Sequence, residues 1–134
     1  MKKLENYTNC LNVLNNADFE MADSDEIYRT GIIRQFHLTY ELAWKSLQTV
    51  LSIHGVKEVD TASPREVLQL GYKSGFIDDV SVWLLMLRER TLSVYMYDAK
   101  EADAMITMIR DRFLPAFITL HEVLEKELSD VMKD

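Results

Sequence analysis

Residues 34–47 read RQFHLTYELAWKSL, and their apolar side chains recur at intervals of three and four. That spacing places them on one face of an α-helix. The segment Asp-Ser-Asp at residues 23–25 offers N-caps before the pattern begins, and Gly55 follows His54 as a C-terminal stop. Such a helix, about 30 residues long, is typical of a bundle rather than of a compact α/β domain. Its predicted buried face consists of Ile32, Phe36, Tyr40 (or Thr39), Ala43, Leu47 and Val50.

Further helices are predicted on both sides of this segment. Upstream, one covers roughly Lys2 to Asn16. Downstream, SPRE at residues 63–66 combines an N-cap serine, a proline at the first helical position and a glutamate at the third, which is a capping box. The short helix that begins there stops before Gly75, and a fourth begins at Asp78 or Asp79. The predicted inward side chains are Leu4, Tyr7, Leu11 and Leu14 in the first helix and Val80, Trp83, Leu84 and Leu87 in the fourth.

A fifth, long helix is predicted to start at Asp98, with Glu101 completing its cap, and Pro115 should bend it because proline removes a hydrogen bond and crowds the preceding turn. The chain has only four glycines and two prolines, and the alternation of half-buried strands is absent. We therefore predict an all-α fold, an up-and-down helical bundle of four main helices plus a short one, in a single domain over residues 1–134. The predicted inward side chains of the fifth helix are Met105, Ile109, Phe113, Phe117, Leu120, Leu124 and Leu128.

The composition narrows the classes of function. A net charge of -7 gives no general attraction to phosphate backbones, so any contact with a nucleic acid would have to be local. The single cysteine, Cys10, excludes a disulfide within one chain and suits a reducing cytosol. The histidines at 37, 54 and 121 lack the spacing of metal ligands. We expect a cytoplasmic protein, because no apolar run approaches the roughly 18 residues that cross a membrane and the N-terminus is no signal peptide.

Polar side chains gather in two places. Residues 88–98, RERTLSVYMYD, place two arginines and two tyrosines at the predicted end of the fourth helix. Taken alone, Glu41 and Lys45 in the long helix form an i,i+4 pair on a solvated surface, worth about 0.3–0.5 kcal/mol. They belong to one face of that helix, which carries Arg34, His37 (or Leu38), Glu41 and Lys45.

Five segments in a fixed order carry a family resemblance. They are F-x-x-x-Y-E-L-A-W-K (residues 36–45), SPREV (63–67), SGFIDD (74–79), the run from Trp83 to RERTLS, and LPAF (114–117). Together they resemble the nucleotidyltransferase substrate-binding family, a branch of the HEPN superfamily of helical domains. The match covers roughly residues 25–120, and the ordered set is more specific than any single segment.

This resemblance implies an up-and-down bundle that forms a homodimer and assembles with a separately encoded minimal nucleotidyltransferase. Many such pairs behave as toxin–antitoxin modules. Catalytic HEPN relatives cut RNA with an arginine, four further residues and then a histidine, and a tyrosine two places after the histidine is common. In this chain, Arg90 matches the arginine and Tyr97 the later tyrosine, whereas Tyr95 occupies the histidine position.

Tyr95 is a poor replacement for histidine as a general base. Cleavage by the 2′-hydroxyl needs a group that exchanges protons near neutral pH, which suits an imidazole with a pKa of about 6.5. A phenol with a pKa of about 10 is ionised in roughly one molecule in a thousand at pH 7. Arg90 can still bind a phosphate. The sequence thus predicts a binding site that has lost its base.

The predicted function is a non-catalytic accessory subunit of the transferase, which would itself bind magnesium and a nucleoside triphosphate; no cofactor is predicted in this chain. A groove between the long helix and the end of the fourth would bind a nucleotide or an RNA end. The alternative is a metal-independent ribonuclease that uses Arg90 with Tyr95. In toxin relatives the transferase can adenylylate the motif tyrosine, here Tyr97, but core packing remains open for both tyrosines. The predicted site residues are Arg34, Glu41, Lys45, Arg90, Tyr95 and Tyr97.

Overall fold

The computed structural model describes residues 1–93 and 98–133. Every regular element in these ranges is helical, which confirms the all-α prediction. The α-helices are α1 (Lys2–Asn15), α2 (Glu26–Ile53), α3 (Pro64–Lys73), α4 (Val80–Leu92), α5 (Ala99–Met108) and α6 (Leu114–Lys133), with 3-10 turns at Met21–Asp23 and Lys57–Thr61 and a π-helical turn at Ile109–Phe113.

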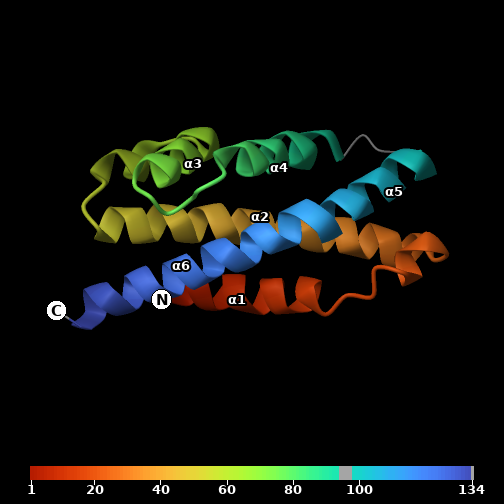
Figure 1. Cartoon of the computed structure of the whole chain (residues 1–134), viewed down its shortest axis with the longest axis horizontal. Coiled ribbons are helices and arrows are strands. Elements are labelled where there is room, and N and C mark those ends of the chain that lie inside the picture. The colour runs from red at the N-terminus through yellow and green to blue at the C-terminus, as the bar shows by residue number, and fades with distance from the viewer. Residues whose placement is uncertain (94–97, 134) are drawn as a thin grey trace.

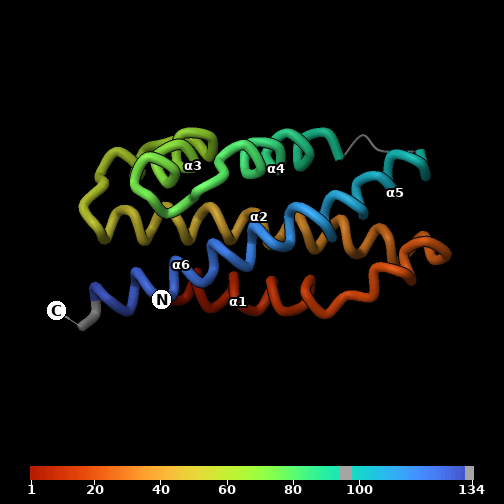
Figure 2. Tube along the Cα trace, viewed as in Figure 1, coloured from red at the N-terminus to blue at the C-terminus, as the bar shows by residue number. Residues whose placement is uncertain are grey.

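Four long segments run alternately up and down, and α3 forms a short extra helix (Figure 1). They are α1, α2, α4 and the arm made by α5 and α6. This arrangement confirms the predicted up-and-down bundle of four main helices plus a short one. In the trace of Figure 2, α2 lies between α1 on one side and α3 with α4 on the other, while α6 crosses it. The central position of α2 means that it contacts nearly every other element.

The predicted boundaries and buried face of α2 are confirmed. Asp25 is the N-cap, and its side chain accepts a hydrogen bond of 3.0 Å from the Tyr28 amide. After the helix, Gly55 has a φ of +95°, a left-handed conformation that favours glycine. All the predicted inward residues are buried, and both Thr39 and Tyr40 belong to the buried face; the full set is Ile32, Phe36, Thr39, Tyr40, Ala43, Ser46, Leu47, Val50 and Leu51.

Helix α1 is joined to α6 by a buried hydrogen bond. Its predicted inward residues are all buried, and among them Tyr7 is fully enclosed. The Tyr7 hydroxyl donates to the backbone carbonyl of Phe117 over 2.6 Å. A polar group in a dry core needs such a partner. The first and last helices are therefore registered against each other by one specific contact.

Helices α3 and α4 begin with the caps that the sequence predicts. Ser63 and Glu66 form a complete capping box, and Asp79, rather than Asp78, caps α4. The buried face of α4 confirms the prediction at Trp83 only, because the other buried residues are Val82 and Met86. Residues 80–87 are apolar at every position except one, so periodicity could not select the face. The predicted inward residues Val80, Leu84 and Leu87 are half-buried.

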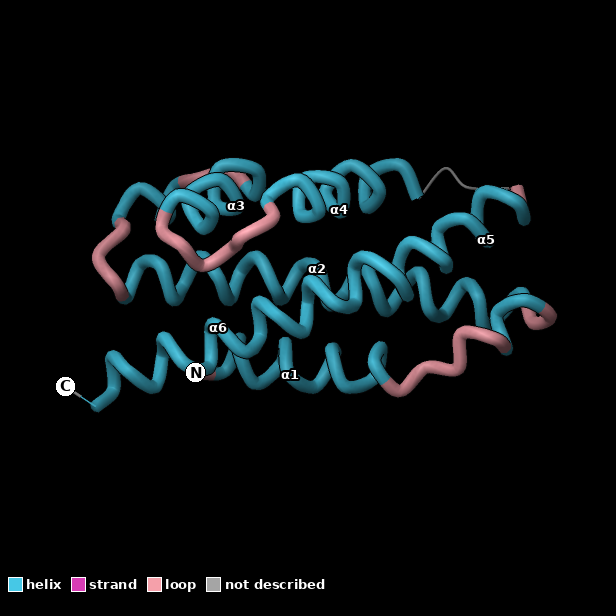
Figure 3. The backbone as a smooth tube through the Cα atoms, in the orientation of Figure 1, coloured by secondary structure: helices cyan, strands magenta, loops and turns pink. Residues whose placement is uncertain are grey.

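The predicted fifth helix is continuous but irregular. It is divided into α5 and α6 by the π-helical turn, although no loop separates the two (Figure 3). The irregularity lies before Pro115 rather than at it. Proline has no N–H to donate and its ring crowds the carbonyl four residues earlier, at Asp111, and a wider turn relieves both problems. Six of the seven predicted inward residues are buried, and Leu128 is half-buried.

We expect Tyr7→Phe to lower the free energy of unfolding by about 1–2 kcal/mol, because it removes a buried donor without creating a large cavity. Urea denaturation measures the change. Tyr72→Phe is the matched control, since Tyr72 is 53% exposed and should tolerate the same change. Equal stability of the two variants would contradict a role for the bond to Phe117.

Candidate functional site

Two of the predicted site residues, Arg90 and Glu41, meet where α2 passes the end of α4. Arg90, in the last turn of α4, forms an ion pair with Glu41 of α2. The Arg90 side chain is 43% exposed and that of Glu41 is 27% exposed. The guanidinium therefore remains accessible from solvent while one carboxylate fixes its position.

Glu41 is shared by three donors. Besides Arg90, it lies 3.8 Å from the ammonium of Lys45, and it accepts a hydrogen bond of 3.2 Å from the indole N–H of Trp44. The local pair of Glu41 and Lys45 is thus present, but the carboxylate is half-buried and also binds a distant helix. This arrangement holds a carboxylate between two cations where α2 passes α4.

Two residues that the sequence analysis did not select complete the site, His37 and Ser93. His37 lies one turn before Glu41 on α2, and its Nε2 contacts the Ser93 hydroxyl. Ser93 is buried and donates to the Arg90 carbonyl over 3.1 Å. Since the hydroxyl proton is used there, Nε2–H of His37 is the donor to Ser93, which leaves Nδ1 as an acceptor. The shared face with Arg34 and Glu41 was a signal for His37, whereas nothing local points to Ser93.

The surroundings of His37 lower its pKa below the ordinary value. Burial is the largest cause, and the positive charges of Arg90 and Arg34 act in the same direction. The negative charge of Glu41 opposes them. The lowered pKa means that the folded chain favours the neutral imidazole.

The remaining predicted residues are placed as follows. Arg34 is exposed on α2, one turn before His37 and on the same side of the helix as Glu41. Tyr95 and Tyr97 lie outside the described residues, so their part in the site rests on the sequence alone. Within the described ranges, no group of three or more potential ligands could hold a metal ion, and no helix there has the length and apolar character needed to span a membrane.

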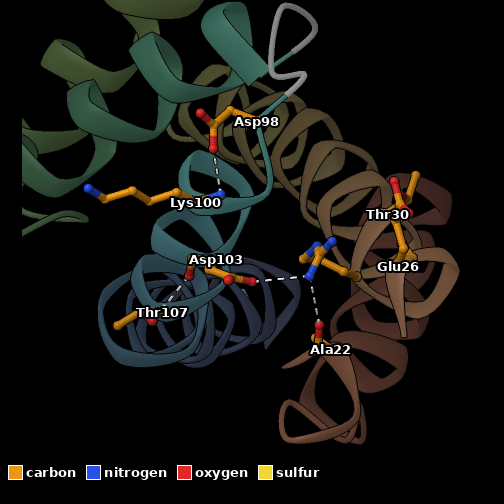
Figure 4. A network of polar contacts seen from close by, with 8 residues as sticks. Ala22, Glu26, Thr30, Asp98, Lys100, Asp103 and Thr107 are labelled. Atoms are coloured by element: carbon orange, nitrogen blue, oxygen red, sulfur yellow. Dashed lines mark hydrogen bonds and ion pairs between the residues drawn. The ribbon is translucent and has the colours of Figure 1, made fainter. Parts of the chain in front are cut away.

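A polar network holds the start of α5 beside the site (Figure 4). Arg29 of α2 donates to Asp103 of α5 over 3.2 Å and to the Ala22 carbonyl over 3.3 Å. Asp98 caps α5 by accepting from the Lys100 amide over 2.7 Å. Between α2 and α5 lies a cavity of about 230 Å³ that reaches Ser93. This cavity shares Ser93 with the contact that His37 makes at the end of α4.

One family model and one relative are similar to this chain in sequence. The family model described as "Nucleotidyltransferase substrate binding protein like" matches residues 2–126. A Haemophilus influenzae protein named "Probable ribonuclease HepT" is 24% identical over 102 residues, which are 75% of this chain and 70% of that protein.

Two solved structures have a similar fold. One, from Haemophilus influenzae, is described as the fold of a substrate binding domain of a nucleotidyltransferase; its TM-score is 0.80 at 24% identity, and the match covers 91% of this chain and 98% of that one. The other, from Thermus thermophilus, has a TM-score of 0.68 at 25% identity, with coverage of 93% and 98%.

We expect stability to fall as the pH drops below about 6.5, the ordinary pKa of histidine. The folded state lowers the pKa of His37, so below pH 6.5 the unfolded chain binds a proton that the folded chain resists. This stabilisation is present above about pH 6.5, and it is lost as the pH falls toward the lower pKa that His37 has in the folded chain. The free energy of unfolding, measured with urea at about pH 7.5 and 5.5, should fall more in the native protein than in His37→Gln.

An NMR titration of the His37 ring, assigned by comparison with His37→Gln, checks the pKa directly. An ordinary or raised pKa would mean that the ring is open to solvent or bound chiefly to Glu41.

Proposed function

The chain belongs to the nucleotidyltransferase substrate-binding-protein-like family, and from this premise we propose that it is the non-catalytic accessory subunit of a separately encoded minimal nucleotidyltransferase. It forms a homodimer in the cytoplasm and is one half of a toxin–antitoxin-type module. Its groove between α2 and the end of α4 binds a nucleotide or an RNA end for the transferase.

The observation that carries this proposal is the half-exposed guanidinium of Arg90 at the groove. Arg34 and Lys45 add positive charge along the same side of α2, in a chain whose net charge is -7. The planar guanidinium fits two oxygens of a phosphate at once, with greater geometric specificity than an ammonium. A local cationic groove on an acidic protein is suited to one phosphate group rather than to a long nucleic acid.

The ion pair with Glu41 sets the condition for binding. A phosphate that reaches Arg90 competes with the Glu41 carboxylate for the same guanidinium. Removing the negative charge of Glu41 should therefore favour the phosphate, and removing the positive charge of Arg90 should oppose it. In this proposal the magnesium ion and the nucleoside triphosphate are bound by the transferase, and the chain contributes positioning.

We expect Arg90→Ala and Glu41→Gln to have opposite effects on affinity. Calorimetry with AMP and with a 5′-phosphorylated RNA oligonucleotide should show binding at least about tenfold weaker for Arg90→Ala, the loss of a charge-assisted contact of about 1.5–3 kcal/mol. Glu41→Gln should bind both probes more tightly than the native chain.

Arg110→Ala is the matched control for this pair. Arg110 is half-exposed on the π-helical turn and pairs with its neighbour Asp111. Arg110→Ala should change neither the affinity for AMP nor the affinity for the RNA oligonucleotide. A fall in melting temperature for Arg90→Ala without a binding defect would instead make Arg90 a structural residue.

A second candidate function is metal-independent RNA cleavage. The observation in its favour is His37, whose Nε2 contacts the Ser93 hydroxyl; that hydroxyl donates to the backbone carbonyl of Arg90, and the pKa of His37 is lowered. Such a group can accept a proton where Tyr95 of the motif cannot. The imidazole would come from α2 rather than from the motif that follows α4.

We expect the purified chain to leave RNA intact in the presence of a metal chelator, as an accessory subunit would. Gel analysis of a labelled RNA tests this. Cleavage that is lost in Arg90→Ala and Tyr95→Phe would favour the ribonuclease motif. Cleavage that is lost in His37→Ala but retained in Tyr95→Phe would identify His37 of α2 as the general base.

A further inference from the structure

A groove on the opposite flank of α2 has apolar walls and no described covering. It lies between the end of α1 and the start of α2 and has a volume of about 400 Å³, with Val13, Leu14, Ala17, Ile27, Gly31 and Ile32 among its lining residues. We call it the α1–α2 groove. It is separate from the Arg90 site, because α4 forms one wall of that site and α1 forms a wall of this groove.

Two large apolar side chains stand exposed at the α1–α2 groove. Ile27 is 85% exposed and Val13 is 60% exposed. Single exposed apolar residues are ordinary on protein surfaces. Here, however, the two most exposed large apolar residues of the described chain line the same depression, which is characteristic of an interaction surface.

Gly31 is a second, independent sign. It lies inside α2, where glycine is less favourable than alanine. Its φ is not positive, and a Cβ added to it would meet nothing within 4 Å. The fold thus requires neither the flexibility nor the small size of glycine at this position. A backbone that approaches from outside would require the small size.

The charges around the groove indicate what kind of partner fits. The segment 18–26 contains five carboxylates, and none of them takes part in an ion pair among the described residues. The start of this segment is held at the groove, because the Asp18 amide donates to the hydroxyl of Tyr28, a lining residue, over 2.8 Å. Glu26, at its end, lines the cavity between α2 and α5 instead. A partner that carries lysine or arginine beside its apolar side chains complements this surface.

We propose that the α1–α2 groove docks an amphipathic helix of the partner transferase, with apolar residues three and four positions apart and basic residues at their flanks. This inference rests on the proposed function, since it assigns the surface where that transferase binds. A second copy of the chain would bring its own acidic segment against this one, which like-charge repulsion opposes. Docking here leaves the Arg90 groove open to its ligand.

The test measures calorimetric binding between the purified chain and the transferase encoded beside it. Ile27→Lys should weaken binding at least about tenfold. It replaces an exposed apolar side chain of the groove with a lysine, which would repel the basic residues of the partner helix. Ile53→Lys is the matched control, at the other end of α2 with 44% exposure, and should bind as the native chain does.

Gly31→Ala separates docking from folding. It should raise the melting temperature by roughly 2–4 °C through helix propensity, yet weaken the binding of the transferase. A merely structural glycine would not give these opposite changes. Added salt should also weaken the binding by the native chain.

Each other outcome overturns the inference. Equal binding by the native chain and by both Ile27→Lys and Gly31→Ala removes the groove assignment and leaves the proposed function standing. Failure of the native chain to bind the transferase would contradict both the groove assignment and the proposed function. A change in the molar mass of the chain alone, measured by light scattering for Ile27→Lys, would show that a second copy covers the groove.

Discussion

The packing of Phe36 against the last helical arm joins the two halves of this bundle. Its ring stacks on Phe113 with centroids 5.1 Å apart and lies 6.1 Å from Phe117. Trp83 of α4 meets Phe117 edge-on at 5.6 Å, and the Tyr7 hydroxyl of α1 binds the Phe117 carbonyl. Aromatic side chains bury large areas and favour such offset and edge-on geometries. The four long segments of the bundle therefore meet at one cluster.

This cluster fixes one face of α2 and leaves its two flanks for function. One flank faces α4 and presents His37 and Glu41 to Arg90 and Ser93. The other flank faces α1 and opens at Gly31 into the α1–α2 groove. In the proposed function one flank binds a phosphate ligand and the other a protein partner, and both flanks belong to the same helix. In this proposal α2 connects the two binding events physically.

Local signals in the sequence predicted most of the fold. The caps at Asp25, Ser63 and Asp98 depend on side chains within three residues of the helix starts, so the sequence contains all the information that they need. The face of α4 was predicted less well, because an almost uniformly apolar segment has no periodicity to interpret. The π-helical turn was also missed, since the effect of Pro115 appears in the turn before it.

The candidate site was accessible from the sequence only in part. The face that contains Arg34 and Glu41 follows from helical spacing, whereas the bond between His37 and Ser93 joins residues 56 positions apart. Such contacts depend on how the helices pack, and the spacing of residues along one sequence does not show which distant residues will meet. The family resemblance points to Arg90 and Tyr95, and it does not include an imidazole on another helix.

The π-helical turn at Ile109–Phe113 has an implication for comparing chain lengths within this family. A turn of this kind holds about one residue more than a regular helical turn, so it can accommodate one extra residue without breaking the helix. On both sides of it the arm keeps its apolar side chains in the core, as Met105 in α5 and Leu120 in α6 show. Relatives without the extra residue can keep the same core if they omit it here, and alignments should place their gap within these five positions.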